Sequence, residues 1–163
     1  MVAITTGAVA EPVSASEPET PIVFGQPLDE LLSKYPDAKP LGDGSYQLQP
    51  GVRLVPPMDP SEIGVNEWPS GCDDQWFCVY DMTDFAGWSE WYYECYEQYV
   101  PDDLGISSMH NAQNSYRAYF YDTDVSPMVY GSLGPNSYWR NMAKNTASDG
   151  RSWNNRIDKV DPC

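Results

Sequence analysis

Short runs of alternating apolar and polar residues fill the chain after about residue 70. Alternation with a period of two is typical of half-buried β-strands, and a continuous short apolar run is typical of a strand buried on both faces. No segment in this region holds the 3.6-residue period of a helix for three turns, so helices should be short or absent. The pattern predicts an all-β sandwich or barrel, with strands at residues 76–80, 89–94, 116–121 and 128–130.

Residues 27–68 carry a different pattern, which predicts a small helix-plus-hairpin segment. Leu28, Leu31 and Leu32 have helical spacing, and Pro36 ends the helix. Two short alternating runs, at 46–49 and 52–55, flank the turn residues Pro50 and Gly51. The segment is too small to be stable alone, so it either packs on the main domain or stays loose.

Composition separates a tail from a core. Residues 1–26 are rich in Pro, Glu, Ser, Thr and Ala and are predicted to be disordered. Residues 69–163 hold all the cysteines and most of the aromatic residues, so the main domain lies there. The small residues Ala8 and Ala10 resemble the end of an export signal. Alternatively the chain begins here, and reaches an oxidising place as part of a virus particle.

The net charge of −15 limits the partners. A nucleic-acid surface needs clustered Lys and Arg, and an anionic membrane would be repelled, so neither is expected. A cationic partner, Ca²⁺, or simple solubility remain compatible with the acidity. No apolar run approaches the roughly 20 residues of a membrane span.

The four cysteines, Cys72, Cys78, Cys95 and Cys163, favour disulfides and an oxidising compartment. A zinc site would need paired Cys-x-x-Cys spacings or several histidines, and His110 is the only histidine in the sequence. Four cysteines allow three pairings.

Tyr80, Gly87 and Ser89 form a spaced motif within the first two predicted strands. The glycine would adopt a backbone conformation that a Cβ disfavours, in a tightly folded hairpin. The tyrosine would cover this hairpin, and the serine hydroxyl would hold it by hydrogen bonds to backbone. This spacing resembles the signature of the βγ-crystallin Greek-key motif.

A longer resemblance includes this motif. The order Pro69-Ser-Gly-Cys72, Cys78-Val-Tyr80, Asp84-Phe-Ala-Gly87, Cys95 and Ser107-Ser108 is similar to that of small secreted actinobacterial peptidase inhibitors related to the Streptomyces metalloproteinase inhibitor. The similarity covers about residues 33–163 and is densest over 69–111. It implies a βγ-crystallin-like Greek-key sandwich, with Cys72 bonded to Cys78 and Cys95 to Cys163. The second half departs from the pattern, because Met128 stands where glycine is expected.

The same resemblance places a calcium-binding loop at Asp103, Ser107 and Ser108. Leu104 replaces an expected Asp or Asn there. Because Ca²⁺ takes six to eight oxygen ligands, the lost carboxylate predicts weak binding at most.

No set of catalytic residues stands out. Neither Gly-x-Ser-x-Gly nor His-Glu-x-x-His occurs, and His110 is interpreted as a surface or loop residue. Paired carboxylates for glycoside hydrolysis stay open, since their separation is a three-dimensional property.

The expected function is therefore that of a secreted, monomeric binding protein that inhibits an extracellular peptidase and is not an enzyme. The closed loop between Cys72 and Cys78 is the candidate inhibitory segment, and it contains Asp73, Asp74, Gln75, Trp76 and Phe77. The alternatives are a structural coat protein of a particle or virion, and a calcium-stabilised crystallin domain. The aromatic run from Trp88 to Tyr99 is either covered by residues 27–58 or forms a recognition patch.

Overall fold

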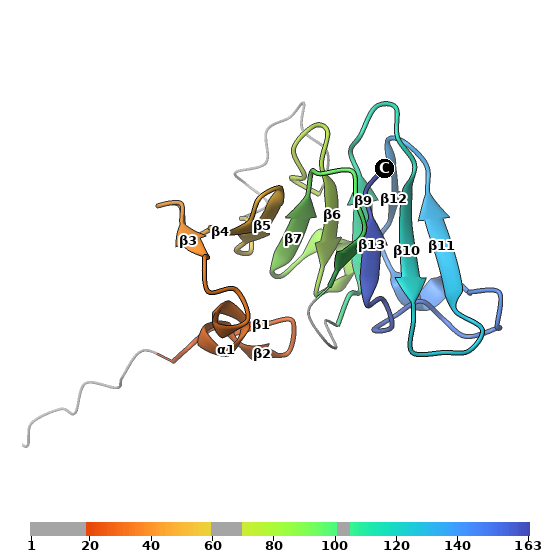
Figure 1. The fold of residues 1–163 in the computed structure, drawn as a ribbon, viewed down its shortest axis with the longest axis horizontal. Helices are drawn as coiled ribbons and strands as arrows, with labels where there is room; N and C mark the ends of the chain where they lie inside the picture. The colour runs from red at the N-terminus through yellow and green to blue at the C-terminus, as the bar shows by residue number, and fades with distance from the viewer. Residues whose placement is uncertain (1–18, 60–69, 101–104) are drawn as a thin grey trace, which may run out of the picture.

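The structure is a computed structural model that describes residues 19–59, 70–100 and 105–163. Strands in antiparallel sheets dominate it, which confirms the all-β prediction (Figure 1). Within the described residues there is one α-helix, α1 (Leu28–Ser33), and it is six residues long. No helix in this part of the chain is long and apolar enough to span a membrane.

Two sheets form the body of the domain. The larger sheet has the strand order β12-β9-β6-β7-β5-β4-β3 and the smaller has the order β11-β10-β13-β8. The larger comprises β3 (Lys39–Pro40), β4 (Tyr46–Gln49), β5 (Val52–Val55), β6 (Phe77–Tyr80), β7 (Ser89–Tyr92), β9 (Ser108–Asn111) and β12 (Ser137–Trp139). The smaller comprises β8 (Gln98–Tyr99), β10 (Ala118–Asp122), β11 (Val129–Leu133) and β13 (Lys159–Asp161). Two 3₁₀ turns, η1 (Thr83–Phe85) and η2 (Met142–Lys144), lie in the connections.

The main core lies between these sheets. Alternate residues of each strand point into it, as the period of a strand requires. The larger sheet contributes Leu54, Phe77 and Met109, and the smaller contributes Phe120 and Val160; all five are fully buried in one apolar cluster.

β6 and β7 are buried on both faces, because a second apolar cluster covers the outer side of the larger sheet. Phe77 and Val79 point into the main core, whereas Cys78 and Tyr80 belong to the second cluster. This accounts for the continuous apolar run in the sequence at β6. The second cluster consists of Cys72, Cys78, Tyr80, Phe85, Trp91 and Ala112.

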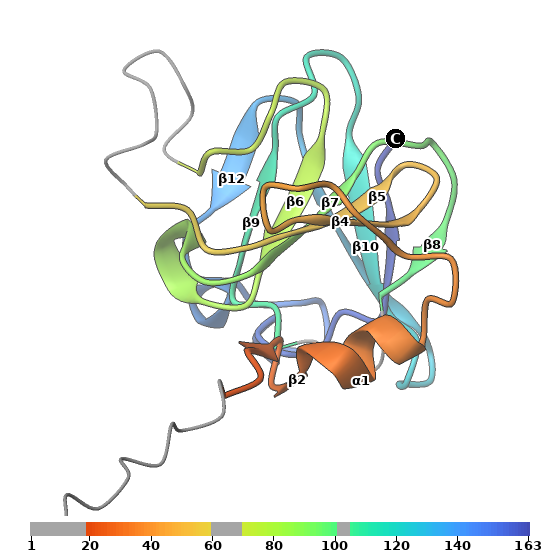
Figure 2. The same ribbon diagram turned by 90° about the vertical axis from the view of Figure 1, so that its left-hand side faces the viewer.

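The helix-plus-hairpin segment packs on the rest of the domain. Its hairpin, β4–β5, extends the larger sheet, because β5 pairs with β7. Helix α1 lies at one end of the strands (Figure 2), and its Leu31 is fully buried in the main core. Of the two alternatives for this segment, packing on the main domain is therefore the observed one.

Residues 22–26 differ from the expected disordered tail, of which residues 1–18 lie outside the described residues. β1 (Ile22–Val23) pairs with β2 (Gln26–Pro27), and Val23 and Phe24 are buried in the main core. The apolar residues Val23 and Phe24 are therefore buried, although the tail around them is polar in composition.

Gly131 on β11 marks a tight contact within the core. A Cβ at this position would lie 2.2 Å from Cε2 of Phe120 and 3.0 Å from Trp153. We expect Gly131→Ala to lower the free energy of unfolding by about 1–3 kcal/mol through overpacking, as measured by urea denaturation. Gly134→Ala is the matched control, because its nearest neighbour would be Ser137 Oγ at an ordinary 3.6 Å. Equal losses in the two variants would contradict this explanation.

Candidate binding site

The β6–β7 hairpin forms the base of the site. Gly87 has a φ of +78°, and a Cβ there would lie 1.8 Å from a carboxylate oxygen of Asp81. Its conformation is therefore one that glycine alone adopts without strain. The Tyr80 ring packs edge-on against Phe85 in the hairpin, with 5.4 Å between the ring centroids.

The serine that holds this hairpin is not the expected one. Ser108 Oγ donates to the carbonyl of Met82 at 2.6 Å and accepts from the backbone N–H of Phe85 at 3.0 Å. Ser89 Oγ instead accepts a hydrogen bond from the indole N–H of Trp91 at 2.8 Å. Ser89 is therefore tied to the second apolar cluster rather than to the hairpin backbone.

Both disulfides have the pairing that the resemblance implies. Cys72 is bonded to Cys78, with 6.1 Å between their Cα atoms, and Cys95 is bonded to Cys163. The first closes a short loop next to the hairpin. The second joins the segment after β7 to the end of the chain after β13.

Backbone hydrogen bonds fix the short loop in addition to its disulfide. The N–H of Gln75 donates to the carbonyl of Ala112 at 3.1 Å, and the N–H of Ala112 donates to the carbonyl of Trp76 at 2.9 Å. A turn inside the loop is closed by the N–H of Trp76 and the carbonyl of Asp73, 3.2 Å apart. The loop is thus held to the chain segment that follows β9.

The five loop residues are not equally accessible. Asp73 and Asp74 are exposed at the tip, and Gln75 and Trp76 are half-buried. Phe77 is fully buried in the main core, because it is the first residue of β6. A partner that met this loop would therefore contact Asp73, Asp74, Gln75 and Trp76.

Aromatic and cationic side chains flank the loop. The ring centroid of Trp76 lies 5.3 Å from that of Tyr93 and 6.0 Å from that of Trp91. The guanidinium carbon of Arg53 lies 4.9 Å from the centroid of Trp76. Tyr93 is half exposed, so the flank presents ring surface to solvent beside an acidic tip.

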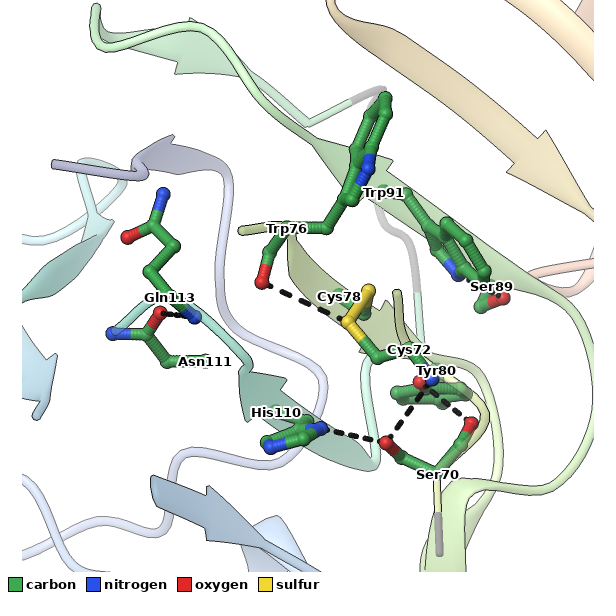
Figure 3. Close-up of a disulfide and its surroundings, with 10 residues drawn as sticks. All are labelled: Ser70, Cys72, Trp76, Cys78, Tyr80, Ser89, Trp91, His110, Asn111 and Gln113. Atoms are coloured by element: carbon green, nitrogen blue, oxygen red, sulfur yellow. Dashed lines mark hydrogen bonds between the residues drawn. A yellow bond between two sulfur atoms is a disulfide. The ribbon is translucent and has the colours of Figure 1, made fainter. Parts of the chain in front are cut away.

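Buried polar groups support the loop from below (Figure 3). Ser70 Oγ lies 2.6 Å from His110 Nδ1 and accepts from the N–H of Cys72 at 3.2 Å. The Tyr80 hydroxyl donates to the carbonyl of Ser70 at 2.9 Å. These contacts fix the chain entering the disulfide.

His110 is not the surface or loop residue that the sequence suggested. It lies on β9 and is 1% exposed, and Ser70 beside it is 2% exposed. Burial lowers the pKa of His110 to about 4, so its imidazole is neutral near pH 7. This Ser–His contact is therefore buried, next to the chain that enters the Cys72–Cys78 loop.

The predicted calcium loop is only partly described. Asp103 lies outside the described residues, Ser107 Oγ donates to the carbonyl of Gly105 at 3.3 Å, and Ser108 holds the hairpin. No group of three or more His, Cys, Asp or Glu side chains suited to a metal ion occurs among residues 19–59, 70–100 and 105–163.

Comparisons with protein-family models, with curated proteins and with solved structures found no match to this chain. The geometry of the site is therefore what supports a function.

One further concave surface was not singled out from the sequence. A groove of about 750 Å³ lies between the β8 region and the loops at residues 122–125 and 151–158. Arg156, which lines this groove, pairs with Asp122 and Asp149. These hydrogen bonds hold the pKa of Asp149 far below its usual range. This network joins two loops that are distant in sequence. A local sequence pattern therefore could not have predicted their contact.

Proposed function

We propose that this chain is a secreted binding protein that inhibits an extracellular peptidase. Two disulfides support a protein that folds in an oxidising compartment. The Cys72–Cys78 loop is the segment that would enter the peptidase cleft.

The observation that carries this proposal is the fixed shape of an exposed loop. Asp73 and Asp74 are exposed, while the disulfide and the bonds to Ala112 hold the backbone on both sides. Binding through such a loop loses little conformational entropy, so more of the contact energy remains as affinity. Trp76 and Tyr93 add ring surface of the kind enriched where binding energy concentrates.

The features of the β6–β7 hairpin support the resemblance to βγ-crystallin-like inhibitors. The left-handed Gly87 and the packing of Tyr80 on Phe85 agree with a folded hairpin capped by an aromatic ring. This agreement concerns the scaffold, and a scaffold does not determine function by itself. The inhibitory activity therefore needs its own test.

That test is a panel of metallo- and serine peptidases, assayed with the full chain and intact disulfides. We expect inhibition of at least one enzyme at micromolar protein. Asp74→Arg should weaken it by about tenfold or more, because a reversed charge at the centre of a contact removes complementarity and adds repulsion.

Asp37→Arg is the matched control, since Asp37 is exposed and lies outside the loop. It changes the net charge equally and should leave inhibition unchanged. No inhibition across the panel would remove the proposal. An equal loss in Asp37→Arg would show that overall charge, and not the loop, is responsible.

A further inference from the structure

The outer face of the smaller sheet carries a row of residues in register across its four strands. Tyr130 of β11 is opposite Tyr121 of β10, Tyr121 is opposite Lys159 of β13, and Lys159 is opposite Tyr99 of β8. Their strand neighbours, such as Phe120 and Val160, point into the core. The row spans three strand spacings, or roughly 14 Å.

The two ends of this row are open to solvent. Tyr99 is 74% exposed and Tyr130 is 64% exposed, which makes them the most exposed large hydrophobic side chains among the described residues. Lys159, between the rings, is 8% exposed. We call Tyr99, Tyr121, Tyr130 and Lys159 the tyrosine row.

The row already binds one cation of its own. Lys159 Nζ lies 4.5 Å from the centroid of the Tyr121 ring and 3.0 Å from a carboxylate oxygen of Glu97. An ammonium over an aromatic face is attracted by the negative potential of that face. The local surroundings of the row are therefore suited to a positively charged group.

Charge limits what could cover the open ends. The chain carries a net charge of −15, so a second copy, a nucleic acid or an anionic membrane would be repelled. Burial raises the pKa of the Tyr121 phenol, and the negative charges of Asp161 and Glu97 add to that rise. Lys159 is paired with Glu97, Arg117 donates to Ser132 Oγ at 3.2 Å, and Arg156, which lines the groove beside Tyr99, is paired with Asp122 and Asp149. Carboxylates therefore pair with Lys159 and with Arg156, and Arg117 has a hydroxyl acceptor.

We propose that the tyrosine row is a second binding surface, which takes an arginine- or lysine-bearing segment of a partner protein with its cationic groups over Tyr99 and Tyr130. Arginine fits best, because its planar guanidinium stacks on a ring and is weakly hydrated. This surface uses none of the residues of the Cys72–Cys78 loop. The proposal can therefore be tested independently of peptidase inhibition.

Calorimetric titration of the full chain tests this surface. One probe is a capped peptide of alternating glycine and arginine, and the second replaces each arginine by citrulline, its neutral isostere. We expect binding of the arginine peptide and much weaker binding of the citrulline peptide. The double variant Tyr99→Val and Tyr130→Val should bind the arginine peptide at least about fivefold more weakly, since each lost cation–π contact at an exposed site contributes modestly.

The double variant keeps the net charge, and valine suits both strand positions. Tyr116→Val is the control, because Tyr116 is 53% exposed and lies outside the row; its affinity should equal that of the parent. Equal binding by the double variant and the parent would show diffuse attraction to an acidic protein and overturn the proposal. Equal binding of the two peptides would overturn it too. A neutral oligosaccharide such as cellohexaose, bound by the parent and lost in the double variant while the arginine peptide is not bound, would assign the row to a different ligand.

Discussion

Removing the long-range disulfide, by Cys95→Ala together with Cys163→Ala, should lower the free energy of unfolding by about 4 kcal/mol in the chain-entropy account of cross-links. The bond joins residues 68 positions apart, so the unfolded chain regains much freedom when it is absent. It also holds the end of β13, which lies between β10 and β8 in the smaller sheet. Urea denaturation followed by tryptophan fluorescence measures the loss.

A reducing agent provides the control for this prediction. With both disulfides opened, the parent and the double variant should have the same stability, because the cross-link is then absent from both. A difference of several kcal/mol that persists under reducing conditions would contradict the explanation, and would assign the effect to the alanine side chains. A loss below about 1 kcal/mol in oxidising buffer would contradict it as well, since that is far less than a loop of this length predicts.

The strands that were predicted correctly are those whose own residues include a clear apolar run or an apolar–polar alternation. β6, β7, β10 and β11 all lie within a few residues of the expected segments. The hairpin β4–β5 and the start of α1 were equally readable, because proline and glycine mark their ends. Apolar periodicity and turn residues are local signals, and they suffice where burial follows from them.

β9 (Ser108–Asn111) was expected to be part of a loop, because residues 103–111 resemble the calcium-binding loop of crystallin-type domains. The structure buries all four residues, in a strand that lies between β12 and β6 in the larger sheet. Each polar side chain has a partner outside the strand: Ser108 bonds to Met82, His110 to Ser70, and Asn111 Nδ2 donates to the carbonyls of Tyr116, Leu133 and Gly134. Burial of polar groups depends on such partners, and a local pattern does not contain them.

In the candidate site, too, some features follow from local sequence and others depend on contacts between distant segments. The disulfide loop and its acidic tip could be predicted from cysteine spacing and the family resemblance. The position of Trp76 against Tyr93 and Arg53 could not, because it depends on the pairing of β7 with both β6 and β5. Cys78 is opposite Trp91 on one side, and Arg53 is opposite Trp91 on the other. Only the sheet order brings these side chains to one surface.

Glu90 provides the second large prediction, because its carboxyl is buried inside the main core. It lies on β7, opposite Val79 of β6 and Leu54 of β5, and is fully buried. The Tyr92 hydroxyl donates to one oxygen, whereas the other has no hydrogen-bond partner among the described residues. Burial raises the pKa of Glu90 from 4.5 to about 7, and the bond from Tyr92 opposes that rise.

This raised pKa makes the stability depend on pH in a defined direction. Below pH 4.5 the carboxyl is protonated in both the folded and the unfolded chain, and the full stability is present. Between pH 4.5 and about 7 the unfolded chain releases the proton while the folded chain keeps it, so stability falls as pH rises. Above pH 7 the loss is complete, and amounts to about 3 kcal/mol for a difference of this size.

Glu90→Gln should remove this pH dependence, because an amide cannot ionise. We expect the free energy of unfolding of the variant, relative to the parent, to rise by about 3 kcal/mol between pH 4.5 and pH 8. Urea denaturation of both proteins at several pH values measures this difference. Contributions from other titrating groups, such as His110, which is opposite Cys78 on the other face of the sheet, are common to both proteins and cancel.

The exposed Glu30 of α1 supplies the control for Glu90. Glu30→Gln changes the net charge by the same amount, and its stability relative to the parent should stay nearly constant over this pH range, because an exposed carboxylate interacts weakly in both states. A constant difference between Glu90→Gln and the parent would mean that the pKa of Glu90 is the same in the folded chain as in the unfolded chain. The core around β7 would then have to hold a charged carboxylate with only the Tyr92 hydroxyl as a partner in the described residues, which the cost of burying an unpaired charge opposes.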